Sequence, residues 1–158
     1  MLKDNQAKIY RSAVAMLARR EHSQRELAQK LQRKYGNSDA LEVVLAEVSE
    51  QGLQSDERYA ESLARGRVNR GYGPSYVRQE MRSKGVDGEL AEQILEILDP
   101  DWQTLATEQV QRRFPESSTD PDVWLKACRF LQRRGFDGRV TQAAVGQRPR
   151  ENFSKEST

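Results

Sequence analysis

The sequence predicts an all-α protein in which three tandem three-helix repeats form an elongated, curved array. Leu31, Met81 and Leu131 fall at successive steps of 50 residues (81 − 31 and 131 − 81), and Gly85 and Gly135 share that step. Helix-capping residues recur in the same register, and no segment shows the alternation of a strand. A period of this length in helical sequence is typical of linear arrays, in which each unit buries a small core and packs against its neighbours.

The repeats are expected at residues 7–53, 54–99 and 100–145, between a disordered N-terminus (1–6) and a disordered tail (146–158). The first repeat should contain a helix over Ala7–Arg20, a second that follows Ser23, and a third that stops at Gly52. The second helix starts at a capping box, in which the Ser23 oxygen accepts from the third amide and Glu26 reaches back to the serine N–H.

The second repeat has its ends marked most clearly. Acidic residues at Asp56 and Glu57 suit the first turn of a helix, because they face the positive end of its dipole. Gly73 can serve as the next N-cap with Pro74 as the first helical residue, and Gly85 can take the left-handed conformation that closes that helix. A sixth helix should follow and stop before Pro100, because the helical conformation is disfavoured for the residue that precedes a proline.

Three further helices are expected in the third repeat. The first follows Asp101 and ends at Pro115, and the second begins at Pro121 and closes at Gly135. A short last helix is capped by Asp137 and runs through Val145.

Composition limits the classes of function. The 158 residues are 36% hydrophobic and 32% charged, with a formal net charge of +2, so attraction to a polyanion must come from clustered charge. A single cysteine excludes an internal disulfide, and no apolar run approaches the ~20 residues of a membrane span. Because no signal-peptide stretch follows Met1, we expect a reduced, cytoplasmic setting. We also expect the protein to be a monomer.

Signals for catalysis are missing from the sequence. The one histidine, His22, is placed for a staple or surface role at a helix entry, and Cys128 shares an apolar stripe with Trp124 and Leu131. No phosphate loop, dinucleotide glycine pattern or Cys/His cluster with metal spacing is present. We therefore expect no enzyme, no cofactor and no metal.

A basic face is the strongest functional signal, because its cations are opposed by few acids. Tyr72 lies just before Gly73, the N-cap of the arginine-rich helix that begins at Pro74. Its ring either packs against the protein or stacks on a base or a partner side chain. Together with Tyr72, the candidate partner- or DNA-binding residues are Arg65, Arg67, Arg70, Arg78, Arg82 and Lys84 in the second repeat and Arg129, Arg133 and Arg134 in the third.

Short motifs occur in order in all three repeats, over roughly residues 7–145. They are Arg20-Glu21-His22-Ser23, Glu26-Leu27, Lys30-Leu31, Asp56 to Ala60, Gly71-Tyr72-Gly73-Pro74, Arg78-Gln79-Glu80, Lys84-Gly85, Phe130-Leu131 and Arg134-Gly135-Phe136. Together these motifs closely resemble the RecX family. The resemblance implies a negative regulator that binds the RecA filament on single-stranded DNA, in its groove or at its end. It further implies inhibition of ATP hydrolysis, strand exchange and coprotease activity. Because the net charge is only +2 and is locally concentrated, we expect binding to free DNA to be weak.

A free-standing DNA-binding module of the helix-turn-helix kind is the alternative, with the fifth or eighth helix as reader. Direct readout needs Arg, Asn or Gln at the start of a helix, and the fifth helix starts with Pro74, Ser75 and Tyr76. The sequence does not distinguish filament capping from groove binding or subunit removal, and it leaves the stoichiometry and the contact face on RecA open.

Overall fold

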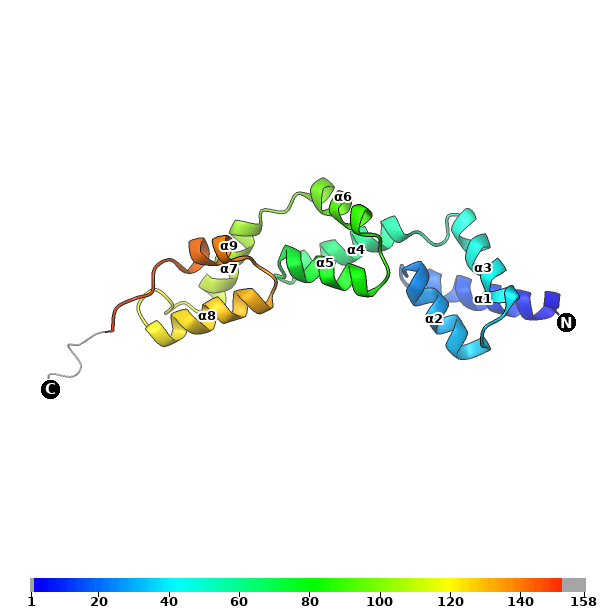
Figure 1. Ribbon diagram of the computed structural model, residues 1–158, viewed down its shortest axis with the longest axis horizontal. Coiled ribbons are helices and arrows are strands. Elements are labelled where there is room, and N and C mark those ends of the chain that lie inside the picture. The colour runs from blue at the N-terminus through cyan, green and yellow to red at the C-terminus, as the bar shows by residue number, and fades with distance from the viewer. Residues whose placement is uncertain (1, 152–158) are drawn as a thin grey trace. The chain divides into compact units, whose positions relative to one another are not determined.

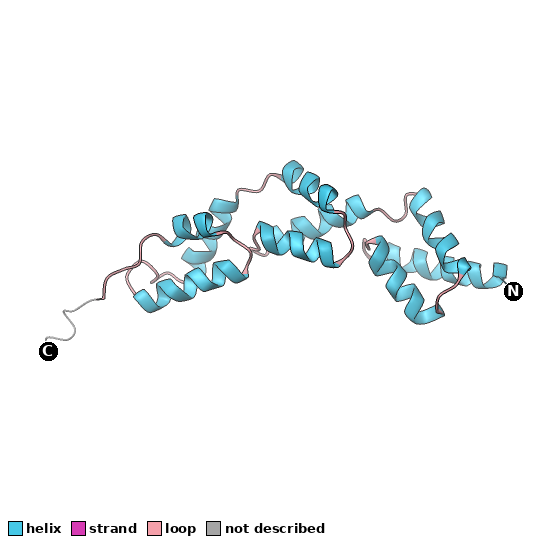
Figure 2. Cartoon of the chain, in the orientation of Figure 1, coloured by secondary structure: helices cyan, strands magenta, loops and turns pink. Residues whose placement is uncertain are grey.

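The computed structural model describes the backbone of residues 2–151 and the side chains of residues 4–151, and all regular elements within that range are α-helices (Figures 1 and 2). In chain order they are α1 (Leu2–Arg19), α2 (Gln24–Tyr35), α3 (Asp39–Glu50), α4 (Asp56–Asn69), α5 (Pro74–Ser83), α6 (Gly88–Leu98), α7 (Trp102–Arg113), α8 (Pro121–Arg133) and α9 (Gly138–Val145). The expected all-α fold of three helical triplets is confirmed, while its elongated, curved form stays a prediction.

The two ends of the chain differ from expectation in different ways. Helix α1 begins at Leu2, so disorder is wrong for residues 2–6; Asp4 lies in the first turn, where it suits the helix dipole. Residues 146–151 of the expected tail contain neither helix nor strand, and residues 152–158 lie outside the described part of the chain.

The chain divides into two compact units, and each is described here by itself. Unit 1 comprises Met1–Ala64 with Glu80–Glu96. Its hydrophobic core is formed where α1, α2 and α3 pack together, and tyrosine and leucine side chains such as Tyr35 and Leu45 cover the margin. The fully or nearly fully buried members of this core are Ile9, Ala13, Leu27, Leu31, Ala40, Leu41, Val44 and Val48.

Unit 2 comprises Arg65–Gln79 with Ile97–Thr158. Its core lies between α7, α8 and α9, where half-buried aromatic side chains such as Trp102 and Trp124 surround smaller apolar ones. The buried members are Ala106, Val110, Ala127, Leu131, Phe136 and Val145.

Side-chain caps begin most of the helices in the way the sequence predicts, with one exception. Ser23 Oγ accepts from the Glu26 amide at 3.1 Å, and Asp101 and Asp137 accept from the third amides of α7 and α9 at 3.0 and 2.8 Å. The exception is Glu26, whose two carboxylate oxygens accept from Arg20 at 2.9 Å each. The reciprocal half of the predicted capping box is wrong, because a bidentate arginine contact is stronger than a bond to one neutral amide.

Candidate partner-binding site: an arginine-lined hollow

The start of α5 is joined to the end of α8 by backbone hydrogen bonds within unit 2. The Gly73 amide donates to the Arg134 carbonyl at 2.7 Å, and the Ser75 amide donates to the Gly135 carbonyl at 3.1 Å. These bonds satisfy amide groups at the N-terminus of one helix and carbonyl groups at the C-terminus of the other, which otherwise lack partners. The sequence motif Gly71-Tyr72-Gly73-Pro74 is therefore a structural joint.

Glycine is required at this joint for steric reasons. A Cβ on Gly73 would lie 2.7 Å from the Gly135 carbonyl carbon, and a Cβ on Gly135 would lie 2.4 Å from the Tyr76 nitrogen. Gly135 also has a φ of +95°, which confirms the predicted left-handed closure, as does the φ of +82° at Gly85. Only residues without a side chain allow the two backbones to approach this closely.

Arg134 is held rigidly beside the joint. Its Nη1 donates to the Arg70 carbonyl at 3.0 Å, and its guanidinium carbon lies 4.2 Å from the centroid of the Tyr72 ring and 4.8 Å from that of Phe130. The Tyr76 ring stacks on Tyr72 with a centroid separation of 4.2 Å. The Arg134 guanidinium and the Tyr76 ring, each 4.2 Å from the Tyr72 centroid, are too close to it to occupy the same face of the ring. Both faces of Tyr72 are therefore covered. Tyr72 therefore supports Arg134, and its ring is closed to a nucleic-acid base.

This joint forms one wall of an open hollow of about 300 Å³ in unit 2. Four guanidinium groups lie around it, and no carboxylate lines it. Arg112 and Arg113 come from the last turn of α7, and Arg70 and Arg134 directly follow the ends of α4 and α8. The lining residues are Asn69, Arg70, Tyr72, Gln109, Arg112, Arg113 and Arg134.

Among the described residues, no acidic side chain neutralises the charge of the hollow. The side chains of Arg70 and Arg112 are exposed, and among the described residues neither has an acidic partner. Arg113 lies over the Phe130 ring at 4.9 Å, a contact that leaves its charge intact. Because four like charges repel one another, the arrangement favours an anionic ligand, and guanidinium forks match the geometry of carboxylate or phosphate oxygens.

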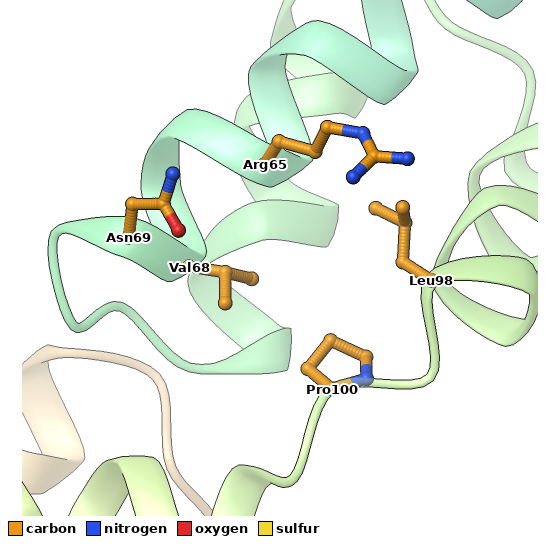
Figure 3. Close-up of a pocket in the computed structure, with 5 residues that line it drawn as sticks. All are labelled: Arg65, Val68, Asn69, Leu98 and Pro100. Atoms are coloured by element: carbon orange, nitrogen blue, oxygen red, sulfur yellow. The ribbon is translucent and has the colours of Figure 1, made fainter.

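Only part of the predicted basic face converges on this hollow. Arg70, Tyr72 and Arg134 line it, whereas Arg65 lines a separate hollow of about 190 Å³ with Val68, Asn69, Leu98 and Pro100, where its side chain extends toward Leu98 (Figure 3). The remaining predicted residues lie elsewhere: Arg67 is half-buried in α4, Arg78 and Arg82 are exposed on α5, Arg129 and Arg133 are exposed on α8, and Lys84 lies in unit 1, 3.8 Å from Glu26.

Sequence reasoning missed four lining residues: Asn69, Gln109, Arg112 and Arg113. The adjacent arginine pair in the last turn of α7 was the available signal. Its significance depends on the close approach of α7 to the joint, where Gly71, with a φ of +87°, packs directly against the Gln109 side chain. A contact between segments this far apart in the sequence is not visible from local pattern.

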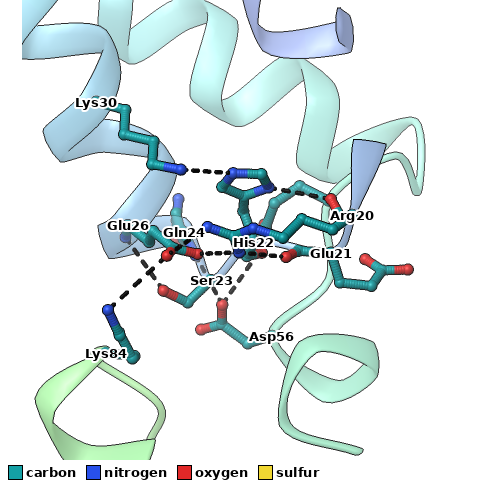
Figure 4. A network of polar contacts seen from close by, with 10 residues as sticks. Arg20, Glu21, His22, Ser23, Gln24, Glu26, Lys30, Asp56 and Lys84 are labelled. Atoms are coloured by element: carbon teal, nitrogen blue, oxygen red, sulfur yellow. Dashed lines mark hydrogen bonds and ion pairs between the residues drawn. The ribbon is translucent and has the colours of Figure 1, made fainter. Parts of the chain in front are cut away.

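His22 belongs to a polar network in unit 1 that has a structural role (Figure 4). Its ring is 2% exposed; Nδ1 contacts the Arg20 carbonyl at 3.0 Å, and Nε2 contacts the Lys30 ammonium at 3.1 Å. Because an ammonium can only donate, Nε2 accepts, and the neutral ring donates from Nδ1. Burial, followed by the charges of Arg20 and Lys30, lowers the pKa of His22. The expected surface role is therefore wrong, since the ring is buried.

The same network ties α4 to α2. Asp56 accepts from the Gln24 amide at 2.9 Å and from Gln54 Nε2 at 3.0 Å, and Gln54 also donates to the His22 carbonyl at 3.3 Å. Burial raises the pKa of Glu26, but the hydrogen bond and charge of Arg20 outweigh it, so the net pKa of Glu26 is lowered. These contacts explain the Arg20-Glu21-His22-Ser23 motif as a fold element.

Other candidate chemical groups are partly buried or dispersed. Cys128 is half-buried, and burial raises the pKa of its thiol, which disfavours the reactive thiolate. Across the described part of the chain, no three His, Cys, Asp or Glu side chains gather as metal ligands. Within the same range no helix combines the length and apolarity needed to cross a membrane.

Comparison with known families gives the identity of the chain. Residues 10–46, 55–95 and 99–145 match the models of the first, second and third three-helix domains of RecX. The chain belongs to the RecX family. All four arginines of the hollow lie in matched segments. Arg70 is in the second domain, and Arg112, Arg113 and Arg134 are in the third.

Relatives and solved structures agree with this membership in RecX. The chain is 40% identical to regulatory protein RecX of Stenotrophomonas maltophilia (strain R551-3) over 87% of its own length and 85% of the relative's. It is 40% identical to regulatory protein RecX of Chromohalobacter salexigens over 79% and 82% of the two chains. The crystal structure of RecX from Lactobacillus salivarius superposes with a TM-score of 0.75 at 23% identity, covering 90% of this chain and 96% of that one. The protein is thus a RecX-family regulatory protein.

Proposed function

We propose that this protein is a negative regulator of the RecA recombinase. It binds the RecA–single-stranded DNA filament, in the helical groove or at the filament end, and inhibits ATP hydrolysis, strand exchange and coprotease activity. It acts in the cytoplasm as a monomer, without a cofactor and without catalysis of its own. Membership in the RecX family supports this proposal, because the relatives carry the name of a regulatory protein.

The observation that carries the proposal is the arginine-lined hollow of unit 2. Four guanidinium groups surround about 300 Å³ of open space and no carboxylate lines it. Exposed arginines contribute little to folding stability, since surface ion pairs are worth about 0–1 kcal/mol. A cluster of this kind is better suited to a partner's anionic groups, where bidentate contacts become strong as water is excluded.

The helix-turn-helix alternative is disfavoured by the joint between α5 and α8. The amides of Gly73 and Ser75 at the start of α5 are engaged by carbonyls at the end of α8, so that end of α5 is not free to enter a groove. Helix α8 begins with Pro121, Asp122 and Val123, which carry no donor suited to base edges.

The test is RecA's DNA-dependent ATP hydrolysis and strand exchange with and without the purified protein. Inhibition of both activities is expected. Reversing the charge at Arg70, Arg78 and Arg82 should abolish it while leaving helical content and melting almost unchanged. Unimpaired RecA activity at saturating concentrations of the folded protein would refute the proposed function.

A further inference from the structure

We propose that the arginine-lined hollow binds acidic side chains of a protein segment, and that DNA phosphates are not its ligand. This inference rests on the proposed function, and it names the chemistry of the partner surface that the same site recognises. Two features of the hollow carry it: its discrete size and the occupied faces of the aromatic rings beside it.

The hollow is discrete. Sites that follow a nucleic-acid strand are grooves in which successive cations track successive phosphates. Here the charges of α7 and of the α5–α8 joint converge on one space of about 300 Å³. A space of this size suits one or two carboxylate groups.

The aromatic rings beside the hollow offer no stacking platform. Binding of single-stranded nucleic acid depends on open ring faces, which contribute about 1–3 kcal/mol for each stacked base. Tyr72 is enclosed between Arg134 and Tyr76, with both contacts at 4.2 Å. Phe130 carries two guanidinium groups, those of Arg113 at 4.9 Å and Arg134 at 4.8 Å. The rings hold arginines in place and are thereby withdrawn from bases.

Gln109 also lines the hollow, but it does not select between the two ligands. Its side chain is 5% exposed and its Oε1 is buried, so a ligand in the hollow does not reach that oxygen. The preference for carboxylates over phosphodiesters therefore rests on the discrete size of the hollow and on its covered ring faces.

The probes are two fluorescently labelled oligomers of equal charge, hexaglutamate labelled at its amino end and amidated at its carboxyl end, and a thymidine heptanucleotide with six phosphodiesters. Both are titrated into the full chain at the same salt concentration. The test variant is Arg70→Gln/Arg112→Gln, because both side chains are exposed and neither pairs with an acidic group among the described residues. The matched control is Lys126→Gln/Arg150→Gln, which removes the same charge from exposed positions of unit 2 outside the hollow.

Hexaglutamate binding should weaken about tenfold or more in the test variant and less than about twofold in the control, because charge pairs at desolvated sites are strongly coupled. Arg70→Lys/Arg112→Lys should restore only part of it, since lysine keeps the charge but loses the planar fork. Heptanucleotide binding should fall about equally in the test and control variants. Equal weakening of hexaglutamate in those two variants, or selective loss of the heptanucleotide in the test variant, would overturn the inference. RecA is absent from this assay, so its outcome is separate from that of the proposed function.

Discussion

Replacing Gly135 by alanine should destabilise unit 2 far more than the loss of glycine flexibility alone. The residue combines a φ of +95° with a Cβ position 2.4 Å from the Tyr76 nitrogen and 2.7 Å from its Cβ. The obstructing atoms belong to backbone and to a side chain held by stacking, so they cannot rotate away. Relief requires the start of α5 to separate from the end of α8.

The magnitude follows from two terms. The left-handed conformation costs an alanine about 1–2 kcal/mol. Separating the helices breaks the bonds from Gly73 and Ser75 to the Arg134 and Gly135 carbonyls, worth about 0.5–1.5 kcal/mol each. The total is about 2–5 kcal/mol. Gly146→Ala is the control without a steric clash, because Gly146 also has a positive φ (+70°, with ψ −162°) but nothing within 4 Å of its Cβ position.

Urea unfolding followed by tryptophan fluorescence measures this difference directly. The chain has two tryptophans, Trp102 and Trp124, and both pack against the core of unit 2. With a urea dependence of about 1–3 kcal/mol per molar, Gly135→Ala should lower the midpoint by about 1 M or more. If Gly135→Ala and Gly146→Ala shift the midpoint equally, the close approach of α5 and α8 is not what requires glycine at position 135.

Three further results are expected. Acidification from pH 7.5 to 5 should destabilise the fold, because the pKa of His22 is lower in the folded state than its unfolded value of about 6.5. The neutral ring therefore stabilises the fold fully above the unfolded pKa, and this stabilisation is lost as the pH falls from there toward the folded pKa. His22→Gln should flatten this part of a stability curve measured by urea unfolding at each pH, and an unchanged slope would contradict the assignment. Gly85→Val should cost on the order of 1 kcal/mol or more, since its φ is +82° and a Cβ would lie 2.8 Å from that of Arg25; a parent-like denaturation midpoint would argue against this. Free DNA should bind weakly, without sequence preference and with steep salt dependence, as measured by fluorescence anisotropy; nanomolar, sequence-specific binding at physiological salt would support the helix-turn-helix alternative.

Local rules predicted most of the fold. Capping residues such as Ser23 and Asp137 and the closing glycines Gly85 and Gly135 act through hydrogen bonds and φ angles set by their immediate neighbours. The buried positions Leu31, Met81 and Leu131 are fully buried, as their period implies. A helical stripe shows which side chains face inward without any knowledge of the partner helix.

The candidate site was predicted only in part, because its members meet through tertiary contacts. Arg134 and Arg70 were identified from charge, but Arg112 and Arg113 matter only because α7 approaches the joint. The sequence also does not show which basic side chains pair with acidic ones. Lys84 was assigned to the basic face, yet its ammonium lies 3.8 Å from the Glu26 carboxylate. Sequence shows which charges exist, and packing decides which of them remain unpaired.

RecA's DNA-dependent ATP hydrolysis, measured with the protein and with two charge-reversal variants at equal folded concentration, tests the central claim most directly. The variant Arg70→Glu/Arg112→Glu changes the hollow, and Arg78→Glu/Arg82→Glu changes the exposed face of α5 by the same charge. Inhibition by the parent protein and its loss in Arg70→Glu/Arg112→Glu, with circular dichroism unchanged, is the predicted result. Full inhibition by Arg70→Glu/Arg112→Glu would contradict the account, and loss of inhibition in Arg78→Glu/Arg82→Glu alone would assign docking to α5 instead of the hollow.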